Sequence, residues 1–296
     1  MTQIPADELR RSLLSADPAL SKFDPLPRIL CFDDFDRGHC GWSQLIGNYE
    51  GDLDTMLAGY QPIASPMLST IGHWDGGSHG GVDGSYVLKL ATRPRRDAVT
   101  VGIKRLTFRQ PCPIRLEFYM TFKPEASELA LLEQDVKSIG FLLDLQGSDT
   151  QTNGQRVMPH LRYLNARDGD LQRRWQFKPE APIIHDIGPG VDTVSHFHLE
   201  DTGWRDLPGG NQRLCYNEIP TKVNWHYVSF DFDLRTMQAT AFRCNDRQFD
   251  MSGFEPMRLP AMKNLWCMLN VCLFAETAVD KRAFLYIDSV CLSGDF

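Results

Sequence analysis

The sequence predicts an all-β protein built from antiparallel strands. From Cys31 onward, short segments rich in β-branched and aromatic residues alternate with clusters of Gly, Pro, Asp and Asn. Turn signals at such short intervals are typical of a sandwich or a barrel. The chain has 296 residues, of which 42% are apolar, so it is long enough to bury the core of one large all-β domain or of two ordinary domains.

The first expected element is a helix over residues 6–15. Leu9, Leu13 and Leu14 fall on one side of it, and Asp17-Pro18 ends it. The expected strands follow at residues 85–92, 100–108, 114–122, 138–146, 160–165, 171–177, 193–200, 213–217, 225–233, 238–244, 265–274 and 283–292.

Tight turns support the antiparallel arrangement. Asp168-Gly169 lies between two expected strands, and glycine tolerates the positive φ that a two-residue turn needs. One segment in the middle, residues 125–136, is expected to be helical and to cross between sheets. No repeat or linker interrupts the pattern, so residues 25–296 are expected to form a single β-sandwich domain after an N-terminal helical extension, residues 1–24.

The charge balance argues against a polyanionic partner. There are 31 Lys and Arg against 38 Asp and Glu, a net charge of −7, so neither nucleic acid nor an anionic membrane surface is expected. No stretch approaches the roughly 20 apolar residues of a membrane-spanning helix. The N-terminus lacks the basic start and apolar run of a secretory signal, so a cytoplasmic location is expected.

Three segments in order along the chain carry a resemblance. Phe32-Asp33-Asp34-Phe35-Asp36 precedes Gly41-Trp42, Asn224-Trp225-His226-Tyr227-Val228 lies in the last third, and Phe284-Leu285-Tyr286-Ile287-Asp288-Ser289-Val290 closes the chain. Together they resemble the first strand, the tryptophan–histidine strand and the last strand of the concanavalin-A-like lectin/glucanase superfamily. The resemblance implies a jelly-roll sandwich whose first and last strands pair, and a function related to carbohydrate.

The resemblance also implies a structural calcium ion. Asp34 and Asp288, with Asp33 and Asp36, would supply its oxygen ligands; the alternative is that these aspartates cap strand ends in water. The glucanases of the superfamily carry a catalytic E-x-D-x-x-E strand. The nearest match, residues 133–138, ends in Ser138 instead of the third acid, so it is not expected to be that strand.

A histidine pair is the most informative local motif. In a strand, His196, His198 and Glu200 would share one face, and two imidazoles with a carboxylate can hold a divalent transition metal. The alternative is a solvent-exposed sheet face without any ligand. Cupins also use H-x-H, but their glutamate comes farther along the chain, so the match to a cupin is partial.

Two further strands carry polar side chains. His160 and Arg162 alternate with apolar residues, so they would line a cleft with the histidine pair if the strands are neighbours. The next strand carries Arg173 beside Trp175, and such a pair suits a sugar because indole stacks on the ring while guanidinium binds hydroxyl or carboxylate groups.

Two looser candidates remain. Tyr216 and Glu218 would share a face as an acid–base pair, although residues beside Pro220 more often simply finish a strand. Trp74 lies in a glycine-rich loop, residues 72–84, which is either a sugar-stacking lid or a plain surface loop.

These features favour a cytoplasmic carbohydrate-active protein that binds a saccharide or glycoside on the concave sheet face, a glycoside hydrolase or lyase with metal assistance. The alternatives are a non-catalytic carbohydrate-binding domain and a cupin-like metalloenzyme acting on a non-sugar. No organic cofactor is expected. Catalytic roles are expected for His160, His196, His198, Glu200 and Glu218. Substrate-binding roles are expected for Arg162, Arg173, Trp175, Tyr216 and Trp74. Metal-binding roles are expected for His196, His198, Glu200, Asp34 and Asp288.

Overall fold

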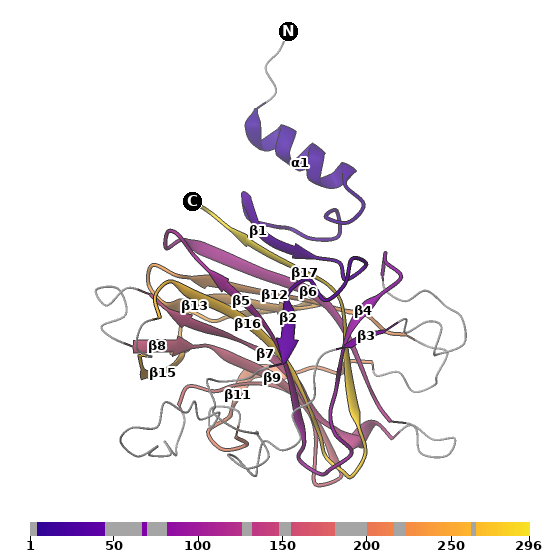
Figure 1. Ribbon diagram of the computed structural model, residues 1–296. Coiled ribbons are helices and arrows are strands. Elements are labelled where there is room, and N and C mark those ends of the chain that lie inside the picture. The colour runs from indigo at the N-terminus through magenta and orange to yellow at the C-terminus, as the bar shows by residue number, and fades with distance from the viewer. Residues whose placement is uncertain are drawn as a thin grey trace.

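Over the residues that the structure describes, the protein is a sandwich of two antiparallel β-sheets with one short α-helix, as the sequence predicts (Figure 1). The computed structural model describes residues 5–44, 67–69, 82–125, 132–147, 155–180, 200–215, 223–261 and 265–296. Helix α1 spans Ala6–Ala16 and lies beyond the sheets, beside β1 and the C-terminus (Figure 1). No helix in these ranges has the length and apolar character needed to cross a membrane.

Eight strands of the described chain form the first sheet. They run in the order β14-β13-β12-β6-β17-β4-β3, with β1 paired to β17. Their bounds are β1 Arg28–Asp33, β3 Met67–Ser69, β4 Val87–Ala91, β6 Pro113–Pro124, β12 His226–Asp233, β13 Gln238–Cys244, β14 Arg247–Asp250 and β17 Ala283–Gly294. The pairing of β1 with β17, with Phe32 opposite Cys291, confirms that the first and last strands meet.

Nine strands of the described chain form the second sheet. Its order is β11-β10-β9-β7-β16-β5-β2, and β8 pairs with both β7 and β15. Their bounds are β2 Trp42–Gln44, β5 Val99–Thr107, β7 Val136–Gln146, β8 Gln155–Met158, β9 His160–Arg167, β10 Asp170–Phe177, β11 Arg205–Asn211, β15 Met257–Pro260 and β16 Met268–Thr277.

The main core lies between the two sheets. The ring of Phe141 on β7 approaches Phe118 and Phe230 of the other sheet, with centroids 5.5 Å and 5.3 Å apart. Alternation along each strand therefore sends every second side chain into this core and the others to an outer face. On the outer face of the nine-stranded sheet, the β8–β15 pair covers a second, smaller apolar cluster that includes Leu142 and Phe274.

Three of the expected elements differ from the structure, and the short strands β8, β14 and β15 were not expected from the sequence. Residues 213–215 are not in a strand, and β11 lies just before them at Arg205–Asn211. Of the helix expected over residues 125–136, residues 126–131 lie outside the described ranges, Glu133–Asp135 form one 3₁₀ turn and β7 begins at Val136. The strand expected over residues 193–200 also lies outside these ranges apart from Glu200, which is in a bend.

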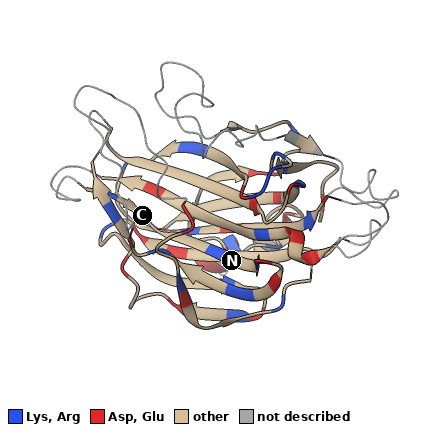
Figure 2. Ribbon diagram, turned by 90° about the horizontal axis from the view of Figure 1, so that it is seen from below, with Lys and Arg blue, Asp and Glu red and all other residues tan. Residues whose placement is uncertain are grey.

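Charged residues are intermingled over the strands. Figure 2 shows basic and acidic positions interspersed along both sheets of the described chain. Local clusters, and not the net charge, therefore decide where a ligand of given charge is held.

Candidate functional site

The candidate site lies on the outer face of the nine-stranded sheet. Leu161 and Tyr163 of β9 are buried in the main core, so His160 and Arg162 lie on the opposite face. The strand order β9-β7-β16 places Arg162 opposite Gly140, and places Ser138 opposite Glu276. Residues far apart in the sequence thus meet on one surface.

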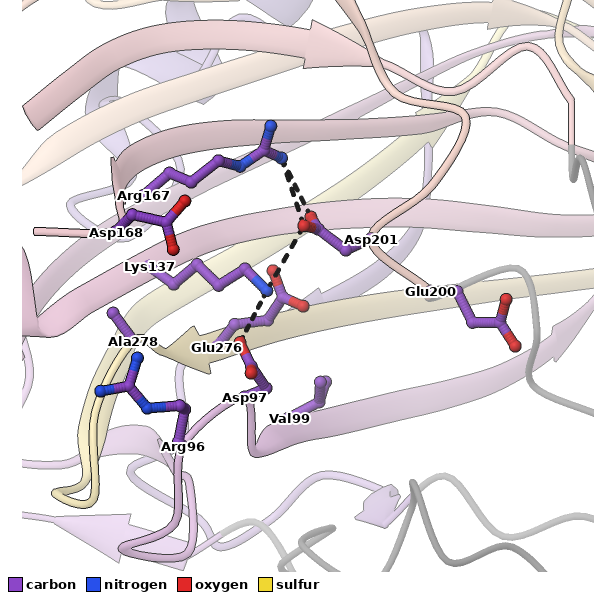
Figure 3. A pocket seen from close by; sticks show the side chains of 10 residues that line it. All are labelled: Arg96, Asp97, Val99, Lys137, Arg167, Asp168, Glu200, Asp201, Glu276 and Ala278. Carbon is purple, nitrogen blue, oxygen red and sulfur yellow. Dashed lines mark hydrogen bonds and ion pairs between the residues drawn. The ribbon is translucent and has the colours of Figure 1, made fainter. Parts of the chain in front are cut away.

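A hollow of about 400 Å³ opens at this end of the sheet. Figure 3 shows the Lys137 side chain directed toward Asp97 and Asp201, with Arg167 reaching Asp201 from the other side. The hollow is lined by Arg96, Asp97, Val99, Lys137, Arg167, Asp168, Glu200, Asp201, Glu276 and Ala278.

Asp201 is the centre of an ion-pair network. Its Oδ1 accepts hydrogen bonds from Arg162 Nη1 at 2.8 Å and Arg167 Nη2 at 3.2 Å. Its Oδ2 lies 3.7 Å from Lys137 Nζ, which donates to Asp97 Oδ1 at 3.0 Å. One carboxylate therefore faces cations from β7 and from both ends of β9.

Arg162 is the buried member of this network. Its side chain is 0% exposed, its Nε donates to Gln176 Oε1 at 2.8 Å, and its Nη1 also lies 3.4 Å from Glu276 Oε2. Glu276 in turn accepts a hydrogen bond from Ser138 Oγ. Nη2 of Arg162 is buried and has no hydrogen-bond partner among the described residues. Buried donors are nearly always paired, so this one is available to an acceptor.

The segment Glu200–Trp204 covers part of the outer face. The indole ring of Trp204 lies over the Arg162 guanidinium, 4.3 Å from its carbon, and 5.4 Å from Lys178 Nζ. The Glu200 carbonyl oxygen accepts hydrogen bonds from Lys178 Nζ at 2.6 Å and Trp204 Nε1 at 3.1 Å. The backbone and the side chains of this short segment therefore contact the cationic groups of Arg162 and Lys178.

The network sets the charge of its members. Burial alone would raise the pKa of Asp201, but Arg162, Lys137 and Arg167 outweigh it and hold the pKa below its ordinary value. Burial alone would lower the pKa of Lys137, but the carboxylates of Glu276, Asp201 and Asp97 hold it above its ordinary value. Both groups are charged at neutral pH.

Burial is the main cause of the pKa shifts of two neighbouring groups, His160 and Lys178. It lowers the pKa of His160 to about 3, so the imidazole is neutral and Nδ1 donates to the Met158 carbonyl oxygen at 2.7 Å. It also lowers the pKa of Lys178 to about 8, with the charge of Arg162 adding to the effect. The outer face therefore holds a lysine whose ammonium is costly to keep charged.

A family model decides how the chain is classified. The model described as "Domain of unknown function (DUF6772)" matches residues 10–296. The chain belongs to this family. No curated protein matches the sequence closely enough to show a relationship.

Solved structures are similar to this DUF6772 chain over most of its length. An endo-acting O-glycanase of the human gut microbiota shares 14% identity at a TM-score of 0.41, covering 90% of this chain and 100% of that one. The endo-1,3-beta-glucanase of Streptomyces sioyaensis shares 13% identity at a TM-score of 0.41, and the match covers 91% of this chain and 98% of that one. Lectin II from Ulex europaeus shares 7% identity at a TM-score of 0.40, and the match covers 90% of this chain and 100% of that one.

Three of the residues expected to be functional lie at the site. Arg162 pairs with carboxylates that line the hollow, and Glu200 lines it. Figure 3 shows the Glu200 side chain apart from the ion-pair network, directed away from Asp201. His160 lies next to Trp204, with ring centroids 6.2 Å apart, and is only 1% exposed, so it is enclosed beneath the covering segment.

Trp175 and Arg173 need correction as sugar ligands. Trp175 is 0% exposed, lies opposite Tyr163 on the core face and donates its indole N–H to Gln212 Oε1 at 2.9 Å, so no sugar can stack on it. Arg173 has a positive φ of 52° at a register shift between β10 and β9. Its guanidinium makes a two-pronged ion pair with Glu133, at 2.9 Å and 2.6 Å, and neither residue lines the hollow.

The aspartates expected to bind calcium do not form a ligand set. Asp288 Oδ2 lies 2.7 Å from the ammonium of Lys22, and its Oδ1 accepts a hydrogen bond from the Val82 amide at 2.8 Å. Asp34 Oδ1 accepts from the amide of Asp36 at 3.2 Å. A lysine thus neutralises Asp288, and the described residues contain no group of three or more His, Cys, Asp or Glu able to hold a metal.

Five further candidates lie outside the described part of the chain. They are Trp74, His196, His198, Tyr216 and Glu218. Their expected roles stay predictions.

The sequence did not point to the residues that dominate the hollow. Asp97, Lys137, Asp201 and Glu276 come from four separate parts of the chain, and no motif links them. One signal was present: Glu276 follows Phe274 by two positions, so alternation places both side chains on the same face of β16.

Proposed function

We propose that this chain binds a saccharide in the hollow on the outer face of the nine-stranded sheet. The observation that carries the proposal is the ring of charged side chains around an open space of about 400 Å³. That size is within the range of small-molecule sites. Planar carboxylate and guanidinium groups at the rim, such as Asp97 and Arg167, hydrogen-bond to hydroxyl pairs in fixed directions.

Two further features support a sugar as the ligand. The partly buried indole of Trp204 lies beside the network and offers an apolar ring against a sugar face. The resemblance of the sequence to a superfamily of lectins and glucanases points to the same class of ligand. The solved structures named above include a lectin and two glycan-acting enzymes, and we extend that ligand class to this chain as part of the proposal.

The electrostatics favour binding over cleavage. A glycosidase needs a carboxylic acid whose pKa is raised, so that it can protonate the leaving oxygen. Asp201 has a lowered pKa and is held by Arg162, Arg167 and Lys137, so it is a carboxylate at neutral pH. Such a group accepts hydrogen bonds from sugar hydroxyls and does not donate a proton.

Glycoside cleavage is a second candidate, because Asp201 and Glu276 contact the same nitrogen of Arg162. Two carboxylates this close can flank a glycosidic bond as nucleophile and acid. Ionised Asp201 would then be the nucleophile or base, and Glu276 the acid. Release of new reducing ends from oligosaccharides, lost in Glu276→Gln, would support this candidate.

A metal-assisted version depends on the histidine pair. His196 and His198, with Glu200, would hold a divalent transition metal that polarises a carbonyl or activates water. Metal analysis of the purified protein and of His196→Ala and His198→Ala tests it. Metal that is lost in both variants supports this version, and equal metal content in all three proteins contradicts it.

Saccharide binding is tested by calorimetry with neutral and acidic oligosaccharides. Lys137→Gln should weaken binding at least about tenfold, because Lys137 both lines the hollow and orients Asp97 and Asp201. Lys104→Gln is the matched control, since Lys104 pairs with Asp33 at 3.1 Å elsewhere on the same sheet. Binding by no oligosaccharide, or equal loss in both variants, would overturn the proposal.

A further inference from the structure

We infer that the saccharide carries a carboxylate, and that Asp201 holds the place of this group in the free protein. The inference rests on the proposed function, because it names the class of saccharide for the same site. It follows from which elements supply the charges around Asp201.

The cations of the site belong to the sheet. Lys137 is on β7, Arg162 and Arg167 are at the two ends of β9, and Lys178 directly follows β10. These positions are fixed by the backbone ladder, since β9 pairs with both β7 and β10. The cationic face is therefore preformed and does not depend on the segment that covers it.

The sheet supplies fewer carboxylates than cations here. Glu276 is on β16, Asp97 lies in the turn before β5, and Asp168 lies in the turn between β9 and β10. Asp201, which contacts Arg162, Arg167 and Lys137, comes from a bend that lies outside the strands. If this bend moves away, the sheet keeps an excess of positive charge facing the hollow.

Two donors on these cations have no acceptor within the described ranges. They are Nη2 of Arg162 and Nε of Arg167, and both atoms are buried. An unpaired buried donor costs free energy in the folded protein, so it marks a place where a ligand oxygen is favoured. A carboxylate offers several acceptor lone pairs and pairs with guanidinium through two parallel hydrogen bonds.

Asp201 is the member that can leave. Its side chain is 42% exposed, whereas Arg162 is 0% exposed and Glu276 is 5% exposed. Neighbours of Asp201 in the segment also contact cations: the Glu200 carbonyl oxygen accepts a hydrogen bond from Lys178, and the Trp204 ring lies over Arg162. The segment Glu200–Trp204 thus presents an acid, a carbonyl and a ring to the cations, much as an acidic sugar would.

The test is titration calorimetry with tetragalacturonic acid, an acidic oligosaccharide, and with neutral cellotetraose. The wild-type protein should bind the acid more tightly. Asp201→Asn removes the competing charge and keeps the shape, so it should tighten binding of tetragalacturonic acid about tenfold and leave cellotetraose within about twofold. Asp231→Asn is the matched control, because Asp231 makes a comparable pair with Arg115 on the other sheet, at 2.7 Å and 2.9 Å.

The outcomes separate the inference from the proposed function. Equal or tighter binding of cellotetraose overturns the inference and leaves saccharide binding intact. Binding of neither oligosaccharide, nor of any other in the calorimetry set, overturns the proposed function itself. Weaker binding of tetragalacturonic acid by Asp201→Asn overturns the inference, because Asp201 would then assist the ligand. If Asp201→Asn does not fold, Arg167→Gln is used instead. It should weaken binding of tetragalacturonic acid about tenfold and leave binding of cellotetraose unchanged. An equal effect on the two ligands contradicts the inference.

Discussion

Arg162 and Asp201 are joined by a hydrogen bond of 2.8 Å, from Nη1 to Oδ1. The arginine is fully buried on β9, and the aspartate lies in a partly exposed bend. This pair therefore connects the rigid sheet to the segment that covers the candidate site.

Removing the arginine should destabilise the fold. Arg162→Met would leave the carboxylate of Glu276 buried without this guanidinium, and loss of one partner from a buried pair costs roughly 3 kcal/mol. Urea unfolding measures the loss. Adding Glu276→Gln to Arg162→Met should restore part of it, and a double variant less stable than the single one would contradict the assignment.

Acid should weaken the fold through His160. The folded pKa of about 3 lies below the ordinary value of 6.5, so between these values the unfolded chain binds a proton that the folded chain excludes. The contribution of His160 to stability is therefore complete above pH 6.5 and is lost as the pH falls toward 3, by at most about 1.4 kcal/mol per unit. Chemical denaturation of wild type and His160→Gln at pH 7 and 4.5 checks this. Equal pH dependence in both proteins would show that His160 titrates normally.

Gly140 should resist enlargement. A Cβ at this position would overlap the backbone carbonyl oxygen of Leu161 and the ring of Phe274 on the neighbouring strands. Gly140→Ala should therefore cost roughly 1–3 kcal/mol in thermal unfolding. At Gly253 no atom lies within 4 Å of an added Cβ, so Gly253→Ala should change stability by less than about 0.5 kcal/mol. Similar effects at both glycines would mean that β7 and β9 are farther apart than described.

Most strands were predictable because the sequence patterns that indicate them involve residues close together in the chain. Alternating side chains on β9 and turn residues such as Asp168-Gly169, both with positive φ, mark strand and hairpin in the sequence itself. The orientation of a strand is less local. Trp175 was assigned to the ligand side, whereas its apolar ring fills the core.

The site was predictable only in part because it depends on strand order. Arg162 was recognised from its own strand, yet its partners Asp201 and Glu276 are 39 and 114 residues away along the chain. Their meeting is set by the register of β9, β7 and β16, which no sequence pattern specifies. The calcium prediction failed for a similar reason, since Lys22, which neutralises Asp288, lies 266 residues away.

A crystal structure of the protein with tetragalacturonic acid bound tests the account most directly. We expect a sugar carboxylate within hydrogen-bond distance of Arg162 and Arg167, with Asp201 displaced from both. A sugar bound on the eight-stranded sheet, or bound while Asp201 remains paired with Arg162, would contradict it.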